Sequence, residues 1–331
     1  MLVLSGDIGG TSTRLQLTEF NDAHSKRLAR EHYANHNHTS LNEIIAEFLA
    51  KYQVDLNQLT SACFAVAGPI IQGTVKFTNL PWFVDEAQLQ QQLQLAKVKL
   101  INDFQAIGYG IVSLAPEDKY LLQHGEPQAH APIAIIGAGT GLGVGIMNWQ
   151  GERYDVIPTE GGHVDFAPVD EMQINLLKYL LKKLHRVSVE RLVSGQGIEN
   201  IYNFVRDNPI YGEQENPKLR LALHTSSDSA AHISEYATVH QDPMAMRALR
   251  LFVKIYGAAA GNLALTTLPY GGLYIVGGIA PKLLPQLTDG RFMKAYSDKG
   301  RMSNLLGSIP IHIVLDTHIG LLGAANYATL L

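Results

Sequence analysis

Asp7 and the glycine pair that follows it have the composition of a polyphosphate site. Asp7 comes after the apolar residues 2–4 and before Gly9-Gly10. Glycine pairs allow positive φ angles and leave no Cβ between backbone and ligand, so the N–H groups of such a turn can converge on an anion. A carboxylate beside an anion is explained if a cation comes with it, and Mg²⁺ on a polyphosphate fits that requirement. The alternative is an ordinary hairpin turn with a capping aspartate.

The pair Asn102-Asp103 offers the groups that an alcohol acceptor needs. It follows the apolar residues 98–101 and precedes a predicted helix. A carboxylate within hydrogen-bond reach can accept the proton of an alcohol that attacks a γ-phosphoryl group. An amide such as that of Asn102 can donate to and accept from a substrate hydroxyl. A helix N-cap is the commoner role for an aspartate in this position, so both interpretations stand.

A second glycine-rich segment repeats the arrangement around Asp7. A predicted strand at 132–136 leads into G-A-G-T-G-L-G at 137–143, and a returning strand follows. The segment does not fit the dinucleotide motif G-x-G-x-x-G, because Leu142 replaces the last glycine and a strand follows instead of a helix. The sequence also lacks the Gly-Lys pair of a P-loop. Two such turns suggest two halves that bind one polyphosphate, although tight hairpins would also explain the glycines.

Further polar residues and glycines follow in the second half of the chain. Glu160 and His163 flank two glycines, and a carboxylate with an imidazole suits a polyhydroxylated substrate. Zinc at His163 would need cysteine partners that are absent from the sequence. Glu190 is predicted in the first turn of a helix capped by Ser188, where a carboxylate also favours the helix dipole. The pair at 277–278 follows an apolar strand and could let a purine or its ribose approach the backbone; tight helix–strand packing is the alternative.

The elements that must position these residues form an α/β pattern. Three strands in series, followed by alternating strands and helices, predict an α/β fold with its site in the loops after strand ends. The chain leaves the first domain near residues 115–118. Apolar periodicity predicts strands at 2–4, 12–18, 26–33, 62–67, 74–78, 98–101, 132–136, 144–149, 152–158, 272–277 and 311–315, and helices after Ser40, from Asp85 to Leu95, from Phe104 to about Leu114, through most of 171–268 and from near Ile319.

Composition excludes several classes of protein. A chain of 331 residues with 46% hydrophobic content suits two folded domains. A net charge of -4 and a pI near 6.3 give no electrostatic reason to bind nucleic acid. The single cysteine, Cys63, lies in an apolar run and fits a reducing cytosol. The apolar stretch 256–280 is broken by glycines and a proline, so we expect a buried helix and a strand, no membrane partner and a cytoplasmic protein.

Together these motifs resemble the bacterial glucokinases that lack zinc, within the hexokinase, actin and heat-shock ATPase superfamily. The resemblance runs almost end to end. It is carried by G-D-I-G-G-T at 6–11 with Arg14, T-N-L-P-W at 78–82, L-I-N-D-F at 100–104, G-A-G-T-G-L-G at 137–143, E-G-G-H-V-D-F-A-P at 160–168, S-V-E-R at 188–191 and G-G-I at 277–279. The sequence departs from many relatives at Ser12, where they have Asn. It also lacks the zinc-binding cysteine cluster of the related repressor/kinase sugar proteins.

The resemblance implies a fold and an activity. The expected fold is a two-domain actin-like ATPase (ribonuclease H-like) fold, with a small domain of residues 1–113 plus 316–331 and a large domain of residues 114–315. A cleft between the domains would close over glucose. The expected reaction is ATP-dependent phosphorylation of D-glucose to glucose 6-phosphate, with Mg²⁺ and without zinc. The family is usually dimeric, which implies a homodimer.

The resemblance also implies a role for each candidate residue. Asp103 would be the general base for the sugar 6-hydroxyl. The residues expected to hold glucose are Asn79, Asn102, Asp103, Glu160, His163 and Glu190. The residues expected to bind ATP are Gly6, Asp7, Ile8, Gly9, Gly10, Thr11, Gly137, Gly139, Thr140, Gly141, Gly277 and Gly278. Asp7 would hold Mg²⁺, through water.

Three other functions remain open from the sequence. The first is a kinase for another hexose or for an N-acetylhexosamine. The second is a non-catalytic sugar sensor; related repressors carry a helix-turn-helix before the phosphate turn, and we expect none here because the first predicted strand starts at Leu2. The third is a chaperone-like or actin-like ATPase, which no basic or peptide-binding feature of the sequence supports.

Overall fold

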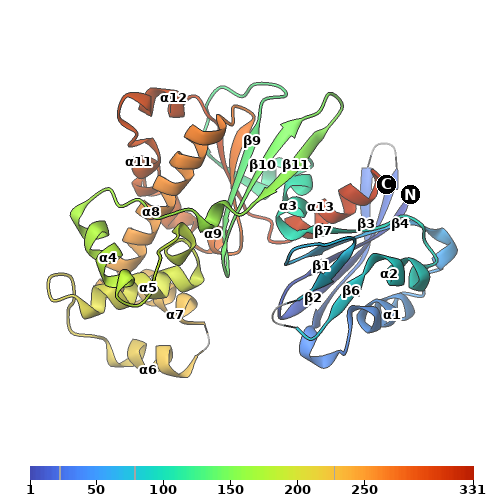
Figure 1. The fold of residues 1–331 in the computed structure, drawn as a ribbon, viewed down its shortest axis with the longest axis horizontal. Helices are drawn as coiled ribbons and strands as arrows, with labels where there is room; N and C mark the ends of the chain where they lie inside the picture. The colour runs from blue at the N-terminus through green and yellow to red at the C-terminus, as the bar shows by residue number, and fades with distance from the viewer. Residues whose placement is uncertain (22–23, 78–79, 227) are drawn as a thin grey trace. The chain divides into compact units, whose positions relative to one another are not determined.

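The computed structural model describes residues 1–21, 24–77, 80–226 and 228–331. They form two compact units (Figure 1). Unit 1 contains residues 1–115, 154–158 and 316–331. Unit 2 contains residues 116–153 and 159–315.

Unit 1 is built on a five-stranded sheet with the order β3-β2-β1-β4-β7. β1 pairs antiparallel with β2 and parallel with β4, and β4 pairs parallel with β7. The sheet strands are β1 (Leu2–Ile8), β2 (Ser12–Asn21), β3 (His24–Ala34), β4 (Leu59–Val66) and β7 (Val98–Asn102), and a separate pair is formed by β5 (Thr74–Lys76) and β6 (Phe83–Asp85). The two parallel pairings place the carboxyl ends of β1, β4 and β7 at one edge of the sheet.

Helices cover both faces of this sheet. The helices of unit 1 are α1 (Leu41–Lys51), α2 (Glu86–Leu93), α3 (Asp103–Ile111) and α13 (Ile319–Ala328). The predicted helix starts after Ser40 and at Asp85 are confirmed, and the side chains of Ser40 and Asp85 cap α1 and α2 by accepting their N–H groups. α1 and α2 share one apolar core with Phe64 of β4. Successive residues of a strand point to opposite faces of the sheet, so Ser61 of β4 points to the face opposite Phe64. There the Ser61 hydroxyl donates a hydrogen bond to the carbonyl of Ala328 in α13.

Unit 2 repeats the strand arrangement of unit 1. Within the unit the strand order is β10-β9-β12-β13-β8. β9 pairs antiparallel with β10 and parallel with β12, and β12 pairs parallel with β13. In this plan β9 corresponds to β1, β10 to β2, β12 to β4 and β13 to β7. The strands are β8 (Lys119–Gln123), β9 (Ile133–Ala138), β10 (Leu142–Trp149), β12 (Gly272–Val276) and β13 (Ile311–Val314); β11 (Tyr154–Thr159) follows β10 in the chain, and its first five residues belong to unit 1.

The helices of unit 2 gather around α8. They are α4 (Glu171–Leu181), α5 (Gly195–Asp207), α6 (Pro217–Thr225), α7 (Ser229–Thr238), α8 (Pro243–Thr267), α9 (Ile279–Lys282), α10 (Leu284–Leu287), α11 (Arg291–Ser297) and α12 (Ser303–Gly307). Short 3₁₀ helices occur in both units: η1 (Asn35–Asn37) and η2 (Leu56–Gln58) in unit 1, and η3 (Pro116–Asp118), η4 (Gly161–His163), η5 (Val189–Arg191) and η6 (Gly300–Met302) in unit 2. α5, α7 and α11 all pack against α8 (Figure 1).

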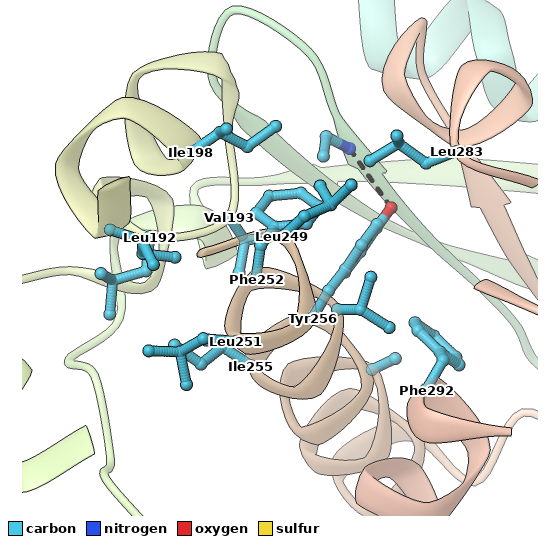
Figure 2. Close-up of a cluster of buried hydrophobic side chains, with 14 of the residues drawn as sticks. Leu192, Val193, Ile198, Leu249, Leu251, Phe252, Ile255, Tyr256, Leu283 and Phe292 are labelled. Atoms are coloured by element: carbon cyan, nitrogen blue, oxygen red, sulfur yellow. Dashed lines mark hydrogen bonds between the residues drawn. The ribbon is translucent and has the colours of Figure 1, made fainter. Parts of the chain in front are cut away.

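Tyr256 joins α8 to the end of β9. Its ring is fully buried among Phe252, Phe292 and neighbouring side chains (Figure 2). Its hydroxyl accepts the Ala138 N–H and donates to the Ile136 carbonyl, each at 3.3 Å. Burial raises the pKa of Tyr256, so the hydroxyl keeps the proton that it donates to the Ile136 carbonyl. The core helix thereby supports the strand end that leads into the second glycine turn.

Among the described residues, α8 is the one helix long and apolar enough to cross a bilayer. Of its most apolar window, 61% is buried inside the structure, which is typical of the core helix of a soluble protein. The prediction of a buried helix followed by a strand at 256–280 is confirmed by α8 and β12.

Two short strands were not predicted. β6 has three residues, too few for an alternating pattern. β8 is an edge strand whose five side chains are all half-buried or exposed, so it lacks the apolar alternation that identifies a strand. α3 also differs from the prediction: it begins at Asp103 instead of Phe104 and ends at Ile111.

Candidate active site

The first glycine turn lies between β1 and β2 and is fixed by a buried amide. Ile8 pairs with Thr13, and inside that pair the Gly9 N–H donates to the Ser12 carbonyl at 2.9 Å. Asn35, only 1% exposed, donates from Nδ2 to the Gly9 carbonyl and from its backbone N–H to the Thr11 carbonyl, both at 2.9 Å. Asn35 Oδ1 accepts the Thr13 hydroxyl at 2.8 Å. The structure therefore adds Asn35, which we had not predicted, as the residue that holds this turn.

Asp7 faces a cross-strand arginine. It pairs in register with Arg14 of β2, and Arg14 Nη1 lies 3.2 Å from Asp7 Oδ2. Burial raises the pKa of Asp7, while the charge and hydrogen bond of Arg14 act in the opposite direction. Within the described part of the chain, no group of three or more His, Cys, Asp or Glu side chains could hold a metal. A single carboxylate nevertheless fits Mg²⁺, which keeps several waters and takes other ligands from phosphates.

Two residues predicted to bind ATP lie in the core of unit 1. A Cβ on Gly6 would lie 2.5 Å from the ring of Phe64, so packing between β1 and β4 explains this glycine. Ile8 is fully buried. Only their backbone could meet a ligand, and their role in ATP binding stays a prediction.

The first turn and Asn102 lie at the ends of β1 and β7, the two strands that flank β4, at one edge of the unit 1 sheet. Ile8 pairs with Val66, and Val66 pairs with Asn102. Adjacent strands are about 4.8 Å apart, so Ile8 and Asn102 are separated by roughly 10 Å. Asp103 follows directly as the first residue of α3. The structure therefore places the Asp7 turn and the Asn102-Asp103 pair at the same edge of the sheet, in loops after strand ends, where the α/β pattern of the sequence predicts a site.

Asn102, and not Asp103, is the N-cap of α3. Asn102 Oδ1 accepts the Phe104 N–H at 2.9 Å, and Asp103 Oδ1 is also 2.9 Å from that nitrogen. The cap occupies Oδ1 of Asn102, so a substrate hydroxyl would meet its Nδ2 donor. The predicted sugar ligand Asn79 lies outside the described residues.

The second glycine turn joins β9 to β10 in unit 2. Ala138 pairs with Leu142, and Gly139 N–H donates to the Gly141 carbonyl at 2.8 Å. A Cβ on Gly139 would meet nothing within 4 Å, which leaves room for a ligand there. A Cβ on Gly141 would lie 2.5 Å from Glu190 Oε2. The three-residue turn 139–141, with Thr140 at its centre, thus has an open side and a side closed by Glu190.

Different features of the structure explain why residues 277 and 278 are both glycine. β12 runs parallel to β9, and Val276 pairs with Gly137, so residue 277 follows at the same sheet edge. Gly277 has φ +90°, and a Cβ there would lie 2.4 Å from the Ala138 carbonyl oxygen. Tight packing therefore explains Gly277. A Cβ on Gly278 would meet nothing within 4 Å, so this residue is the one with space for a purine or ribose.

The structure brings Glu160, His163 and Glu190 together. His163 Nε2 lies 3.7 Å from Glu160 Oε2, and His163 Nδ1 lies 3.8 Å from Glu190 Oε1. The side chain of Glu160 is 90% exposed and that of Glu190 is 28% exposed, so the cluster reaches from the interior to solvent. Beside it is a cavity of about 210 Å³, lined by His163, Arg186, Ser188, Glu190 and Arg191.

The structure gives a packing role to Gly162 and corrects the kind of helix predicted for Glu190. A Cβ on Gly162 would lie 2.0 Å from the Leu142 carbonyl oxygen, so this glycine lets the loop pack on β10 instead of on a ligand. Glu190 lies in the three-residue η5, and the Ser188 side chain makes no cap bond there. The α-helix of this region, α5, begins at Gly195 and is capped by Ser194. Glu190 therefore lies in the first turn of a 3₁₀ helix whose N-cap position is Ser188, and not in an α-helix capped by the Ser188 side chain.

Arg186 holds the histidine loop and was not predicted. Its Nη2 donates to the His163 carbonyl at 2.6 Å and its Nε to Asp165 Oδ1 at 2.7 Å. Backbone bonds from Val189 N–H to the Val164 carbonyl, 2.9 Å, and from the 166 N–H to the 187 carbonyl, 3.0 Å, join the same two segments. These bonds fix His163 beside Glu190, although 26 residues separate them in the sequence.

Comparisons with known proteins agree along the whole chain. The family model described as Glucokinase matches residues 4–331. A glucokinase of Nostoc sp. is 48% identical over 337 aligned residues, which cover 98% of each chain. The crystal structure of a glucokinase from an Antarctic psychrotroph is 30% identical, with a TM-score of 0.86, and covers 100% of this chain and 99% of that chain.

A more distant structure carries information on the fold. A ROK family glucokinase from Streptomyces griseus, solved in complex with glucose and AMPPNP, has a TM-score of 0.64 at 21% identity and covers 100% of both chains. The predicted fold class, an α/β actin-like two-domain ATPase, is confirmed. With the family model matched from residue 4 to residue 331 and a relative at 48% identity, this chain belongs to the glucokinase family.

Proposed function

We propose that this protein transfers the γ-phosphoryl group of ATP to the 6-hydroxyl of D-glucose. One observation carries the proposal in a chain of this family: the Asp7 turn and the Asn102-Asp103 pair follow the ends of β1 and β7, the two strands that flank β4, at one edge of the unit 1 sheet. A phosphate-binding turn and a proton acceptor at one sheet edge are the minimum that phosphoryl transfer to an alcohol requires.

In the proposed reaction Asp103 accepts the proton of the sugar hydroxyl. The oxygen forms a bond to the γ-phosphorus as the bond from that phosphorus to the β,γ-bridging oxygen breaks, and ADP leaves with the electron pair. Asn102 would donate from Nδ2 to a neighbouring hydroxyl. The remaining sugar hydroxyls would bind Glu160, His163, Glu190 and Asn79. Positioning of the acceptor supplies much of the acceleration.

The two glycine turns would bind the phosphates through backbone N–H groups. The first comprises Gly9, Gly10 and Thr11 with Gly6, Asp7 and Ile8 before it; the second comprises Gly139, Thr140 and Gly141 after Gly137. Gly277 and Gly278 would lie by the nucleoside. Mg²⁺ supplies charge neutralisation when bound, and Asp7 would hold it through water.

The proposal extends to the state of the protein in the cell. We infer a cytoplasmic homodimer without zinc and without a nucleic-acid or membrane partner. The domain limits at residues 113 and 315 are also part of the proposal. Chelation with EDTA should abolish turnover and added Mg²⁺ should restore it; restoration only by Zn²⁺ would contradict the metal assignment.

ADP release in the presence of a panel of sugars tests the function. Glucose, mannose, fructose and N-acetylglucosamine are supplied in turn at equal concentration with ATP and Mg²⁺. We expect the highest kcat/KM with glucose. A higher value with another sugar would make the protein a kinase for that sugar, and glucose binding without ADP release from any sugar would make it a sensor.

A further inference from the structure

We propose that Glu190 positions the second glycine turn for the nucleotide, in addition to its expected contact with the sugar. The inference rests on the proposed function, because it takes the turn 139–141 as a phosphate site and the cavity beside His163 as a sugar site. Glu190 is then a positioning residue for a ligand that it does not touch.

One oxygen of the Glu190 carboxylate is committed to the turn. Oε2 accepts the N–H of Leu142, the first residue of β10, at 2.9 Å. The same oxygen stands 2.5 Å from the place of a Cβ on Gly141. Hydrogen bonds to an ionised acceptor are stronger than neutral ones, and this carboxylate is only 28% exposed. The bond therefore restrains the C-terminal end of the turn.

The other oxygen faces the sugar residues. Oε1 of Glu190 lies 3.8 Å from His163 Nδ1, on the cavity that both residues line. A carboxylate with Oε2 engaged by a backbone N–H has Oε1 as its main acceptor for a sugar hydroxyl. The two oxygens thus serve two different sites within unit 2.

The backbone after Glu190 restrains the other end of the same turn. Gly195 N–H donates to the Gly139 carbonyl at 2.8 Å. Ser194 links this point to Glu190, because its hydroxyl donates to the Glu190 carbonyl at 2.7 Å and accepts the Gly197 N–H at 3.0 Å. The segment 190–195 therefore contacts both ends of the turn. Glycines lose more conformational freedom on ordering than other residues, so such restraints prepare the turn for phosphate.

Nucleotide affinity measured without sugar separates this role from sugar binding. The full-length protein is titrated calorimetrically with Mg-ADP in the absence of glucose, and with glucose in the absence of nucleotide. The variants are Glu190→Ala, which removes the acceptor, and Glu190→Gln, whose amide oxygen can still accept the Leu142 N–H. His163→Gln changes the sugar side only and is the matched control.

We expect the variants to change the affinity for ADP and the affinity for glucose independently of each other. Glu190→Ala weakens ADP binding by roughly tenfold, because the Leu142 N–H loses a charge-assisted partner. Glu190→Gln keeps ADP affinity within about threefold of wild type but weakens glucose binding. His163→Gln weakens glucose binding and leaves ADP affinity unchanged. In steady-state kinetics, the KM for ATP rises in the alanine variant and is restored by glutamine.

A double-mutant cycle keeps the test decisive if Glu190→Ala lowers thermal stability. A Cβ at residue 141 collides with the Glu190 carboxylate, so Gly141→Ala weakens ADP binding in the wild type and has no further effect in Glu190→Ala. Three outcomes would each overturn the inference while leaving glucose phosphorylation intact. They are an ADP affinity of Glu190→Ala within twofold of wild type, an equal loss of ADP affinity in the glutamine and alanine variants, and additive effects of the two substitutions in the cycle. A wild-type protein that binds no ADP would refute the proposed function as well.

Discussion

Asn35 shows how a residue away from the chemistry can determine the shape of a phosphate turn. Its side chain accepts from Thr13 and donates to the Gly9 carbonyl, and its backbone N–H donates to Thr11. All three contacts are inside unit 1. A buried amide with both ends paired fixes one conformation, because any other leaves polar groups without partners.

Asn35→Ala should destabilise the protein and loosen the turn. The substitution leaves the Thr13 hydroxyl and the Gly9 carbonyl without their partner, which costs about 2 to 4 kcal/mol of unfolding free energy. We expect the KM for ATP to rise severalfold as the turn loses order. Urea unfolding and ATP kinetics measure the two effects. Asn37→Ala, at an exposed position of the same 3₁₀ helix, should change neither; equal effects from both substitutions would contradict the assignment.

The sequence predicts the groups that could meet substrates better than those that hold them. Asp103, Glu160 and His163 could be proposed because of their chemistry and their place after strands or beside glycines. Asn35 and Arg186 could not, since their partners are backbone carbonyls 26 and 23 residues away. No spacing rule relates an amide in a loop to a carbonyl that the fold brings beside it.

At the scale of elements, the contact between α3 and α13 sets the position of Asp103. α3 begins at Asp103, and α13 packs on it with little space between the backbones. A Cβ on Gly323 would lie 1.6 Å from the Ala106 carbonyl oxygen, and a Cβ on Gly110 would lie 2.4 Å from that of Ile319. Glycine is required here by packing between helices.

Gly323→Ala should move α3 and slow the reaction. The new methyl group must push the two helices apart, which costs about 1 to 3 kcal/mol. It also displaces the helix that carries Asp103, so kcat should fall at least severalfold. Thermal unfolding and steady-state kinetics are the readouts. Gly320→Ala, in the same helix with its closest neighbour at 3.9 Å, is the control and should be neutral; a neutral Gly323→Ala would refute this role of the contact.

Most elements could be predicted because their causes are local. The Ser40 and Asp85 caps, the apolar run at the start of β1 and the alternation in β2 need only neighbouring residues. The sequence leaves open whether Asp103 caps α3, and the structure has Asn102 as the cap; Asn and Asp are both good caps, and only the backbone geometry distinguishes them. β8 depends on its pairing with β13, almost two hundred residues later, and leaves no local pattern.

At the scale of the whole molecule, the two units repeat one plan. In each, an antiparallel hairpin with a glycine turn is followed by two strands that pair in parallel on the other side of the first. The repeated strand, Gly-Thr turn and strand in the sequence predicted the hairpins. The parallel pairings join residues far apart along the chain, so the sequence alone did not give their order. The plan places each turn at the carboxyl edge of its sheet.

Stability should fall in mild acid because of His312. This residue of β13 stacks on Tyr274 at 4.9 Å, and its buried Nδ1 has no hydrogen-bond partner among the described residues. Burial lowers the pKa of His312 to about 4, and the charge of Lys119 acts in the same direction. Because the pKa of His312 is lower in the folded protein than in the unfolded chain, the neutral imidazole makes its full contribution to the free energy of unfolding above about pH 6.5. This contribution is lost as the pH falls towards 4, and the loss is roughly 2 to 3 kcal/mol.

Urea unfolding at several pH values between 7 and 4 measures this loss. His312→Phe should flatten the pH dependence, since it removes the titrating group and keeps a ring on Tyr274. His185→Gln, at an exposed position, should leave the pH dependence unchanged. Equal slopes for wild type and His312→Phe would contradict the role of the buried imidazole.

The turnover of Asp103→Asn tests the central claim most directly. Asparagine has nearly the same shape and can still accept the Phe104 N–H, but it cannot take the proton of the sugar hydroxyl. We predict that kcat for ATP-dependent glucose phosphorylation falls by about a hundredfold to ten-thousandfold, while the glucose Kd from calorimetry stays within about threefold of wild type. A kcat near that of the wild type would contradict the assignment of Asp103 as the base.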